Sequence, residues 1–370
     1  MKKNDLKRTI VILTIAGLIA GCIGGCGKQN EPAEKESSVS VVRSGELMTA
    51  IPVPVDFADK QGWYEELGVE RENVLFANGP AANEAVGAGE IDIYTIGAMP
   101  GILGGIAYNS KIIGWLEDDD AALQIYARKD HPIVQAGKGN LSSAPDIYGT
   151  KETWEDTKII VASATSSHYC VNSVLGMFGL SDTDVQLIDM EGTSGAAAFL
   201  AGEGDLYCSW DPQWNEFAND PDNYVQVATC AMTDKSFICV LMASEDYCKN
   251  NSEEIVKYLE GVVKACDAFA TNEGTYYQAM YNWQSEYAEV TEEEAKGSAQ
   301  LRRMYDLDGL QEWHEIEDGT SKLAETVWEI SDFMVNTGLI EEDAKKELME
   351  SGFVDTSYML QAIENVRAEK

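Results

Sequence analysis

Along most of the chain, short runs of apolar residues alternate with longer segments in which apolar residues recur every three or four positions. The runs are typical of buried strands and the longer segments of amphipathic helices. In the first third we predict strands at residues 38–43, 73–77, 91–96, 111–116 and 123–127, with helices at 52–67, 80–89 and 97–108. Strands and helices that alternate at this spacing indicate a mostly parallel sheet covered on both faces.

The alternation returns after a segment at 130–158 that is rich in Gly, Pro, Ser and Asn. We predict further strands at 185–190, 206–210, 224–228 and 237–243, and a helix at 195–201. The rest of the chain favours amphipathic helices, at 255–269, 275–287, 321–336 and 343–352. A chain of this length is too long for one ordinary core and suits two lobes.

Residues 159–171 combine a buried strand, a hydroxyl-rich turn and the start of a helix. The turn contains Thr165, Ser166 and Ser167, followed by His168. A helix begins with free backbone N–H groups and a partial positive charge, so this turn is a candidate seat for a small anion. The simpler alternative is that one of these hydroxyls merely caps the helix.

Other candidate ligand contacts follow strands of the first half. Ligands of open α/β sheets bind beyond the carboxyl ends of the strands. This rule directs attention to the turns with Asn78 and Gly79, with Ala98 and Met99, and with the acidic residues 117–120. Turn glycines more often serve backbone geometry than ligand approach.

The N-terminus predicts export and lipidation. Basic residues precede an apolar segment at 10–20 that is short for a membrane span, as in a secretory signal. The segment ends in Ile-Ala-Gly-Cys, which resembles the lipobox of bacterial lipoproteins, with Cys22 as the lipidated residue and Cys26 as a weaker second candidate. Residues 22–37 then predict a flexible tether. Acyl chains would hold the protein on a membrane, outside the cytoplasm.

Composition and charge narrow the function. The apolar content of 45% is that of a globular protein, and the net charge of −36 argues against nucleic-acid binding. The eight cysteines are scattered, without the spacing of a zinc site, and they leave a Cys230–Cys239 bridge undecided. We predict no metal and no cofactor.

Several motifs together resemble the substrate-binding proteins of ABC importers for taurine and aliphatic sulfonates. They occur in the order found in that family, over about residues 38–342: Phe-Ala-Asn-Gly at 76–79, Gly-Ala-Gly-Glu-Ile-Asp-Ile at 87–93, Gly-Ala-Met-Pro at 97–100, Thr-Ser-Ser-His-Tyr at 165–169 and Trp-Asp-Pro at 210–212. The resemblance implies an α/β, two-lobed type II periplasmic-binding-protein fold with a ligand cleft between the lobes, which closes by hinge motion.

In that family the turn that matches 165–168 presents hydroxyls and N–H groups to the sulfonate. Two differences from the family's motifs leave the identity of the ligand undecided. The family's first-lobe serines are replaced here by Ala98 and Met99, and the carboxylate that meets the taurine amine falls near Cys239. Carboxylates that could instead contact an amine of the ligand are Asp211 and the residues Asp118, Asp119 and Asp120. Of these three we select Asp120. Trp210 is a candidate cleft wall, with core packing as the alternative.

We therefore predict these segments: a lipoprotein signal at 1–21, the tether at 22–37, lobe 1 at 38–128, lobe 2 at 129–238, and a return to lobe 1 with the C-terminal helices at 239–370. No Ser/His/Asp arrangement predicts catalysis, and His168 and Cys170 diverge on one helix. The expected function is a lipid-anchored, monomeric solute-binding protein that delivers a sulfonate-like anion to a permease and its ATPase. The alternatives are another small anion, a zwitterion or an aromatic solute, a surface sensor without transport, and an extracytoplasmic enzyme.

Overall fold

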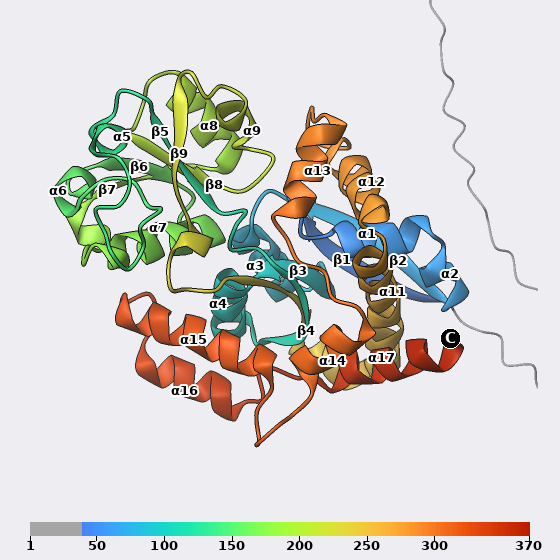
Figure 1. The fold of residues 1–370 in the computed structure, drawn as a ribbon. Helices are drawn as coiled ribbons and strands as arrows, with labels where there is room; N and C mark the ends of the chain where they lie inside the picture. Colours follow the sequence, from blue (N-terminus) through green and yellow to red (C-terminus); the bar gives the residue numbers. More distant parts are fainter. Residues whose placement is uncertain (1–38) are drawn as a thin grey trace, which may run out of the picture. The chain divides into compact units, whose positions relative to one another are not determined.

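The computed structural model describes residues 39–370, in which strands form two five-stranded sheets (Figure 1). In spatial order, the first sheet contains β2 (Val69–Phe76), β1 (Ser40–Leu47), β3 (Ile93–Gly97), β10 (Ile238–Ser244) and β4 (Ser110–Asp118). The second contains β7 (Gln186–Asp189), β6 (Lys158–Val161), β8 (Leu206–Ser209), β5 (Gln124–Arg128) and β9 (Tyr224–Thr229). The predicted signal, the tether and both candidate lipidation sites, Cys22 and Cys26, lie outside the described residues.

Each sheet is parallel except around one strand. The first sheet is parallel at β1–β2 and β1–β3, whereas β10 runs antiparallel to β3 and β4. In the second sheet β6 is parallel to β7 and β8, whereas β5 runs antiparallel to β8 and β9. The two antiparallel strands, β5 and β10, follow the two passages of the chain from one sheet to the other.

The predicted boundary at residues 128 and 129 is wrong by one strand. Residues 124–128 were assigned to lobe 1, but β5 pairs with β8 and β9 of the second sheet. Its apolar pattern fits either sheet, because partner choice depends on residues about 80 to 100 positions further along the chain.

The helices around the first sheet come from distant parts of the chain. From the first half these are α1 (Val53–Lys60), α2 (Trp63–Glu66), α3 (Gly79–Gly87) and α4 (Ala98–Tyr108). The one helix predicted at 52–67 is split into α1 and α2, because Gly62 takes a left-handed conformation (φ 79°) that ends the first helical segment. From the second half come α10 (Glu245–Asn250), α11 (Ser252–Thr271), α12 (Glu273–Gln284), α13 (Glu292–Gln300), α14 (Leu307–His314), α15 (Lys322–Asn336), α16 (Glu342–Glu350) and α17 (Ser357–Glu369).

The second sheet is associated with α5 (Pro132–Ala136), α6 (Lys151–Trp154), α7 (Ser166–Met177), α8 (Gly192–Leu200) and α9 (Asn215–Ala218), and short 3-10 turns occur at Asp182–Asp184 and Cys230–Met232. Helix α7 is buried along most of its length, from Ser166 to Leu175. A separate aromatic cluster, around Phe199, Tyr207 and Phe217, fills the space between β8, α8 and α9.

The two passages between the sheets, residues 119–123 and 230–237, run beside each other and are hydrogen-bonded. The N–H of Asp119 donates to the Phe237 carbonyl (3.0 Å), and the N–H of Ala231 donates to the Asp120 carbonyl (3.1 Å). Two adjacent connections of this kind between two lobes are typical of a hinge, and we call residues 119–123 and 230–237 the hinge.

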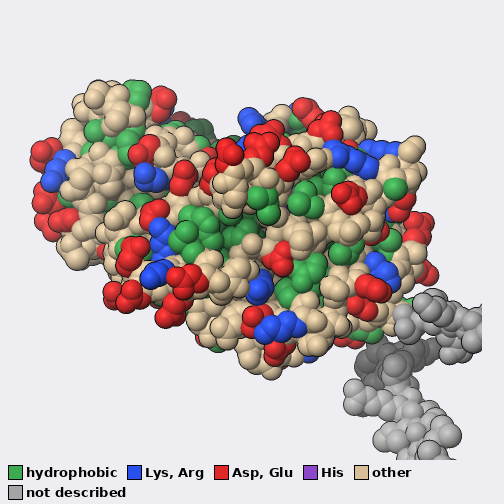
Figure 2. Space-filling model, turned by 90° about the horizontal axis from the view of Figure 1, so that it is seen from below, with side chains coloured by type: hydrophobic (Ala, Val, Ile, Leu, Met, Phe, Trp, Pro, Cys, Tyr) green, Lys and Arg blue, Asp and Glu red, His purple; other side chains and the backbone are tan. Residues whose placement is uncertain are grey.

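Within the described part of the chain, Cys230 and Cys239 are free and buried, as are the four other cysteines there, so the bridge left undecided by the sequence does not form. None of the helices at residues 39–370 is long and apolar enough to cross a membrane. On the face seen in Figure 2, acidic side chains are spread widely, and Lys and Arg occur singly or in small groups.

Helix α4 depends on a close approach that offers a test of the fold. A Cβ added at Gly105 would lie 2.3 Å from the Phe353 ring, so Gly105→Ala should destabilise the protein by about 1–3 kcal/mol through overpacking. Gly176→Ala in α7 is the matched control, since Gly176 is exposed with open space around its Cα, and the change should stabilise by about 0.5–1 kcal/mol. Urea unfolding of both variants measures the difference, and equal effects would contradict the packing of α4 against Phe353.

Candidate functional site

A small cavity lies at the carboxyl ends of strands from both sheets. Its lining comes from the segments after β1, β2, β3, β4, β6 and β8, together with one residue beyond α13: Leu47, Thr49, Ile51, Asn78, Gly79, Gly97, Pro100, Asp119, Thr165, Ser166, Trp210 and Arg302. The space is about 20 Å³, which suits a water molecule. In this conformation the cavity has no room for a larger solute.

The first turn of α7 offers free hydrogen-bond donors at this cavity. Thr165 precedes the helix, but its hydroxyl donates to the Ala162 carbonyl (2.7 Å) and does not cap the helix. Within residues 39–370, the N–H groups of Ser166, Ser167 and His168 and the Ser166 hydroxyl have no hydrogen-bond partner. Simple capping therefore does not explain this turn, and its amides remain available to an anion.

The turn itself is held by side chains behind it. Ala164 lies in the left-handed region (φ 56°), and its N–H donates to Nδ1 of His168 (3.3 Å). The other ring nitrogen of His168 lies 2.8 Å from Oδ2 of Asp182, and because Nδ1 accepts a bond, Nε2 carries the proton. The N–H of Ser163 donates to Asp189 (2.8 Å). His168, predicted as a ligand contact, therefore points away from the cavity and fixes the shape of the turn.

A second helix begins beside α7. Gly97 precedes α4 without a side-chain cap, and a Cβ added to Gly97 would lie 3.5 Å from the Cβ of Ser166. A third helix, α3, starts at Gly79 after Asn78, whose side chain accepts a bond from the Ala81 N–H (3.0 Å). Three helix N-termini around one cavity create a positive potential that favours a negatively charged group.

The opposite wall is a buried cluster of charges around Arg302. Its guanidinium pairs with Glu117 (3.1 Å), Asp119 (2.8 Å) and Asp211 (2.5 Å), and all four side chains are at most 2% exposed. Glu117 and Asp119 come from the end of β4 and the first passage, whereas Asp211 follows β8 of the other sheet. Arg302 thus joins the hinge to the second lobe.

Asp211 is also held by residues of the C-terminal helices. Gln284 of α12 donates to its Oδ2 (2.9 Å), and the Ser298 hydroxyl of α13 donates to the same oxygen. These bonds and the pair with Arg302 hold the Asp211 carboxylate away from the cavity. Asp211, predicted as a ligand contact, belongs to the connection between the lobe and the C-terminal helices.

Asp119 is the carboxylate that remains available at the cavity. Oδ1 of Asp119 has no hydrogen-bond partner among residues 39–370, because its pair with Arg302 lacks hydrogen-bond geometry. Oε2 of Glu117 has no partner there either. Burial raises the pKa of Glu117 to about 8 and that of Asp119 to about 6, and Arg302 opposes both shifts. With the Glu117 carboxyl largely protonated near neutral pH, the one buried cation still lies beside two further carboxyl groups, those of Asp119 and Asp211, so that carboxyls outnumber cations at this end of the site.

Cys239 lies beside two of the carboxyl groups of this cluster. Cys239 of β10 pairs with Glu117 of β4, and ligand atoms of Glu117, Asp119 and Cys239 all lie within 4.8 Å of one another. The end of β4 and the residue after it thus place two carboxyl groups beside Cys239. Although such a trio resembles a metal site, the Arg302 guanidinium already supplies a cation to both carboxylates.

The predicted site residues fall into two groups. Those that line the cavity are Asn78, Gly79, Thr165, Ser166 and Trp210. Those that do not are Ala98, Met99, Asp120, Ser167, His168 and Asp211. Ala98 and Met99 are completely buried in the core, and the Ser167 hydroxyl lies 3.1 Å from that of Thr165.

The sequence did not point to Arg302 or Thr49, and within the acidic run at 117–120 we selected Asp120, whereas Asp119 lines the cavity. The acidic run was a usable signal for Asp119, but adjacent residues point in different directions and the pattern did not decide between them. For Arg302 no local signal existed, because its burial is created by partners about 90 and 185 residues earlier in the chain.

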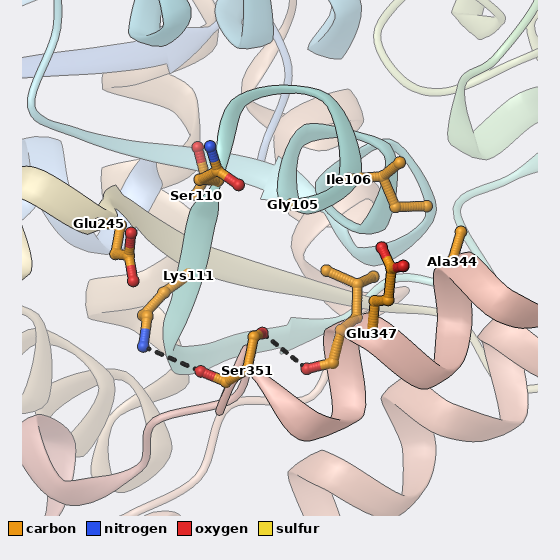
Figure 3. Close-up of a pocket in the computed structure, with 10 residues that line it drawn as sticks. Gly105, Ile106, Ser110, Lys111, Glu245, Ala344, Glu347 and Ser351 are labelled. Atoms are coloured by element: carbon orange, nitrogen blue, oxygen red, sulfur yellow. Dashed lines mark hydrogen bonds between the residues drawn. The ribbon is translucent and has the colours of Figure 1, made fainter.

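Another pocket, of about 260 Å³, lies between α4, β4 and α16 (Figure 3). Lys111 donates to the Ser351 carbonyl (3.4 Å) and the Ser351 hydroxyl donates to the Leu348 carbonyl (2.8 Å). This pocket, which we call the α16 pocket, shares no lining residue with the cavity and contains none of the free helix-terminal donors described above.

Comparisons with known proteins identify the family and the fold. Residues 43–280 match the model of the NMT1-like family. A provisionally named ABC transporter periplasmic binding protein of Brachyspira hyodysenteriae is 22% identical over 91% of this chain and 94% of its own length. A provisionally named aliphatic sulfonates-binding protein of Bacillus subtilis is 27% identical over 56% of this chain and 57% of its own.

Among solved structures, the alkanesulfonate-binding protein of Xanthomonas axonopodis pv. citri bound to MOPS superimposes with a TM-score of 0.63. It is 15% identical and the match covers 82% of this chain and 95% of the other. These likenesses confirm the predicted fold class, the periplasmic-binding-protein fold, and the resemblance seen in the motifs.

The Glu117 carboxyl offers a test of the charged wall. Because its pKa is raised on folding, the unfolded chain loses this proton at a lower pH than the folded protein does, so stability should fall as pH rises from about 5 to about 8. Glu117→Gln should flatten this fall by more than about 1 kcal/mol. The free energy of unfolding in urea, measured across this range, gives the result. Glu70→Gln, an exposed change on β2, is the control, and a parallel curve for both variants would contradict the buried cluster.

Proposed function

The chain belongs to the NMT1-like family and is a substrate-binding protein of the ABC-importer type, and we propose that its ligand is a small sulfonate that also carries an amine. The observation that supports this most is the set of free donors at the start of α7, which faces a cavity between the lobes. A sulfonate is always ionised near neutral pH and has three acceptor oxygens, which match amides at a helix N-terminus.

The charged wall supports the amine. A purely anionic ligand would bring negative charge close to Asp119, which already lies in a cluster with more carboxylates than cations. An ammonium group directed at Asp119 would neutralise part of that excess, because a buried carboxylate is stabilised by an opposite charge. A zwitterion therefore fits the two ends of the cavity better than a simple alkanesulfonate does.

The proposed role needs no chemical step. Capture requires desolvated donors, a charge partner and a hinge, and hydrogen bonds to a charged ligand contribute about 1.5–3 kcal/mol each. Three or four such bonds are enough for micromolar affinity. We further propose that the protein works as a monomer and delivers its ligand to a membrane permease with an ATPase.

Isothermal titration with taurine and ethanesulfonate tests the ligand class. Ser166→Ala should weaken binding of both by about tenfold or more, since one hydrogen bond to a charged group is lost. Asp119→Asn should weaken taurine binding more than ethanesulfonate binding. Ser173→Ala, on the same helix but bonded to the Tyr169 carbonyl, is the matched control. No heat with either ligand, or a Ser166→Ala variant that binds like the unchanged protein, would refute the proposed sulfonate site.

We also propose that the protein is anchored outside the cytoplasm through a lipid on Cys22. In a bacterial host, Cys22→Ser should move the protein from the membrane fraction to the soluble fraction and abolish incorporation of a fatty-acid label. Cys26→Ser is the matched control and should change neither. If Cys26→Ser removes the label and Cys22→Ser does not, the lipid is on the second cysteine; label in both single variants would contradict cysteine acylation at either position alone.

A further inference from the structure

Two consecutive hydrogen bonds connect a surface carboxylate to the turn before α7. The carboxylate is that of Asp182, in the 3-10 turn at Asp182–Asp184, and its Oδ2 lies 2.8 Å from Nε2 of His168. The other ring nitrogen of His168 accepts a bond from the Ala164 N–H (3.3 Å). The side chain of Asp182 is 35% exposed and that of His168 is 7% exposed, so the carboxylate contacts solvent while the imidazole is nearly enclosed.

The backbone of Ala164 depends on this support. Its φ of 56° lies in the left-handed region, which is unfavourable for residues other than glycine because the Cβ crowds the backbone. The next two residues, Thr165 and Ser166, line the cavity. If Ala164 leaves the left-handed region, the backbone that leads into α7 turns, and the free donors of the first helical turn no longer converge on the cavity.

The imidazole supports Ala164 only while it is neutral. Because Nδ1 accepts the bond from Ala164, Nε2 carries the proton directed at Asp182. A second proton can be added only at Nδ1, where it would face the Ala164 N–H, donor against donor. That bond is then lost, whereas the contact with Asp182 is strengthened by the opposite charges. Histidine is the side chain that ordinarily changes charge between about pH 5 and about pH 8.

Other titratable groups around the turn have contacts of their own. Asp189, after β7, accepts a bond from the backbone of the same turn (2.8 Å), and Asp184 caps its own 3-10 turn. The thiol of Cys208 in β8 donates to a backbone carbonyl of α7 (3.4 Å). Among residues 39–370, no Lys or Arg forms an ion pair with Asp182, so the His168 ring is the group there that can neutralise it.

We propose that Asp182 and His168 form a pH switch for the anion site, in which a second proton on the imidazole releases the turn at Ala164 and weakens ligand binding in acid. This inference rests on the proposed sulfonate site. Both side chains are positioning residues, since they act on the ligand through the turn. The protein thus holds its ligand most tightly at neutral and higher pH and releases it as the medium becomes acidic.

The carboxyls at the other end of the cavity act in the opposite direction. Burial raises the pKa of Glu117 to about 8 and that of Asp119 to about 6. As the pH falls, both groups lose negative charge, which would strengthen the binding of an anion. A loss of affinity in acid therefore cannot come from these two carboxyls, and its sign distinguishes the switch from them.

Isothermal titration of the full chain with ethanesulfonate tests the switch, because this ligand has no amine and stays ionised. Affinity should fall about tenfold from about pH 8 to about pH 5, as expected for a lost hydrogen bond and a released turn. In His168→Asn the side-chain oxygen accepts from the Ala164 N–H at every pH, so the loss in acid should disappear. Asp182→Asn should move the midpoint of the loss down by about one pH unit, since a neutral amide stabilises the charged imidazole less.

His131→Asn is the matched control for the titration. His131 caps α5 by accepting a bond from the Ile133 N–H (3.3 Å), and asparagine is a good cap in the same position. The pH profile of this variant should equal that of the unchanged protein. A profile that does not fall in acid, or that falls equally in His168→Asn, would overturn the switch and leave the sulfonate site in place.

Nuclear magnetic resonance of the free protein tests the switch without a ligand. With nitrogen-15 in alanine and histidine, the amide signal of Ala164 should shift with the same midpoint as the ring of His168. An Ala164 signal that does not follow the ring would overturn the switch. If no sulfonate binds at any pH while the two signals titrate together, the sulfonate site is refuted and the switching turn stands as a property of the free protein.

Discussion

The interaction on which the site depends is the burial of Arg302 among Glu117, Asp119 and Asp211. Removal of one partner from a buried ion pair typically destabilises a protein by about 3–5 kcal/mol, because an uncompensated charge is left inside. Here the partners come from the hinge and the second lobe, and Arg302 itself comes from the C-terminal helices. The cluster therefore sets how the lobes meet around the cavity.

This arrangement gives the cavity two ends of opposite character. At one end, three helices begin, and the first turn of α7 retains unbonded amides because Thr165 does not cap it. At the other end, Asp119 lines the cavity, whereas Arg302 and the helices α12 and α13 hold Asp211 elsewhere. The chemistry of the proposed ligand, an anion and a cation on one small molecule, follows from this separation of charge.

Local patterns in the sequence predicted local structure well. The strand, turn and helix at 159–171 placed Thr165 and Ser166 at the cavity, and the rule for strand ends placed Asn78 and Gly79 there. The errors concern long-range contacts. Strand β5 pairs with partners far along the chain, and Arg302 becomes buried through residues of three distant segments. The motif also does not reveal that the His168 ring turns back to Ala164 and Asp182, which leaves only its backbone N–H at the start of α7.

The most direct test of the central claim is a crystal structure of the protein with an aminosulfonate bound. The account predicts sulfonate oxygens within hydrogen-bond distance of the amides of Ser166, Ser167 and His168, with the ligand nitrogen beside Asp119. A sulfonate found elsewhere in the molecule, with the first turn of α7 bonded to protein groups or to water alone, would contradict it.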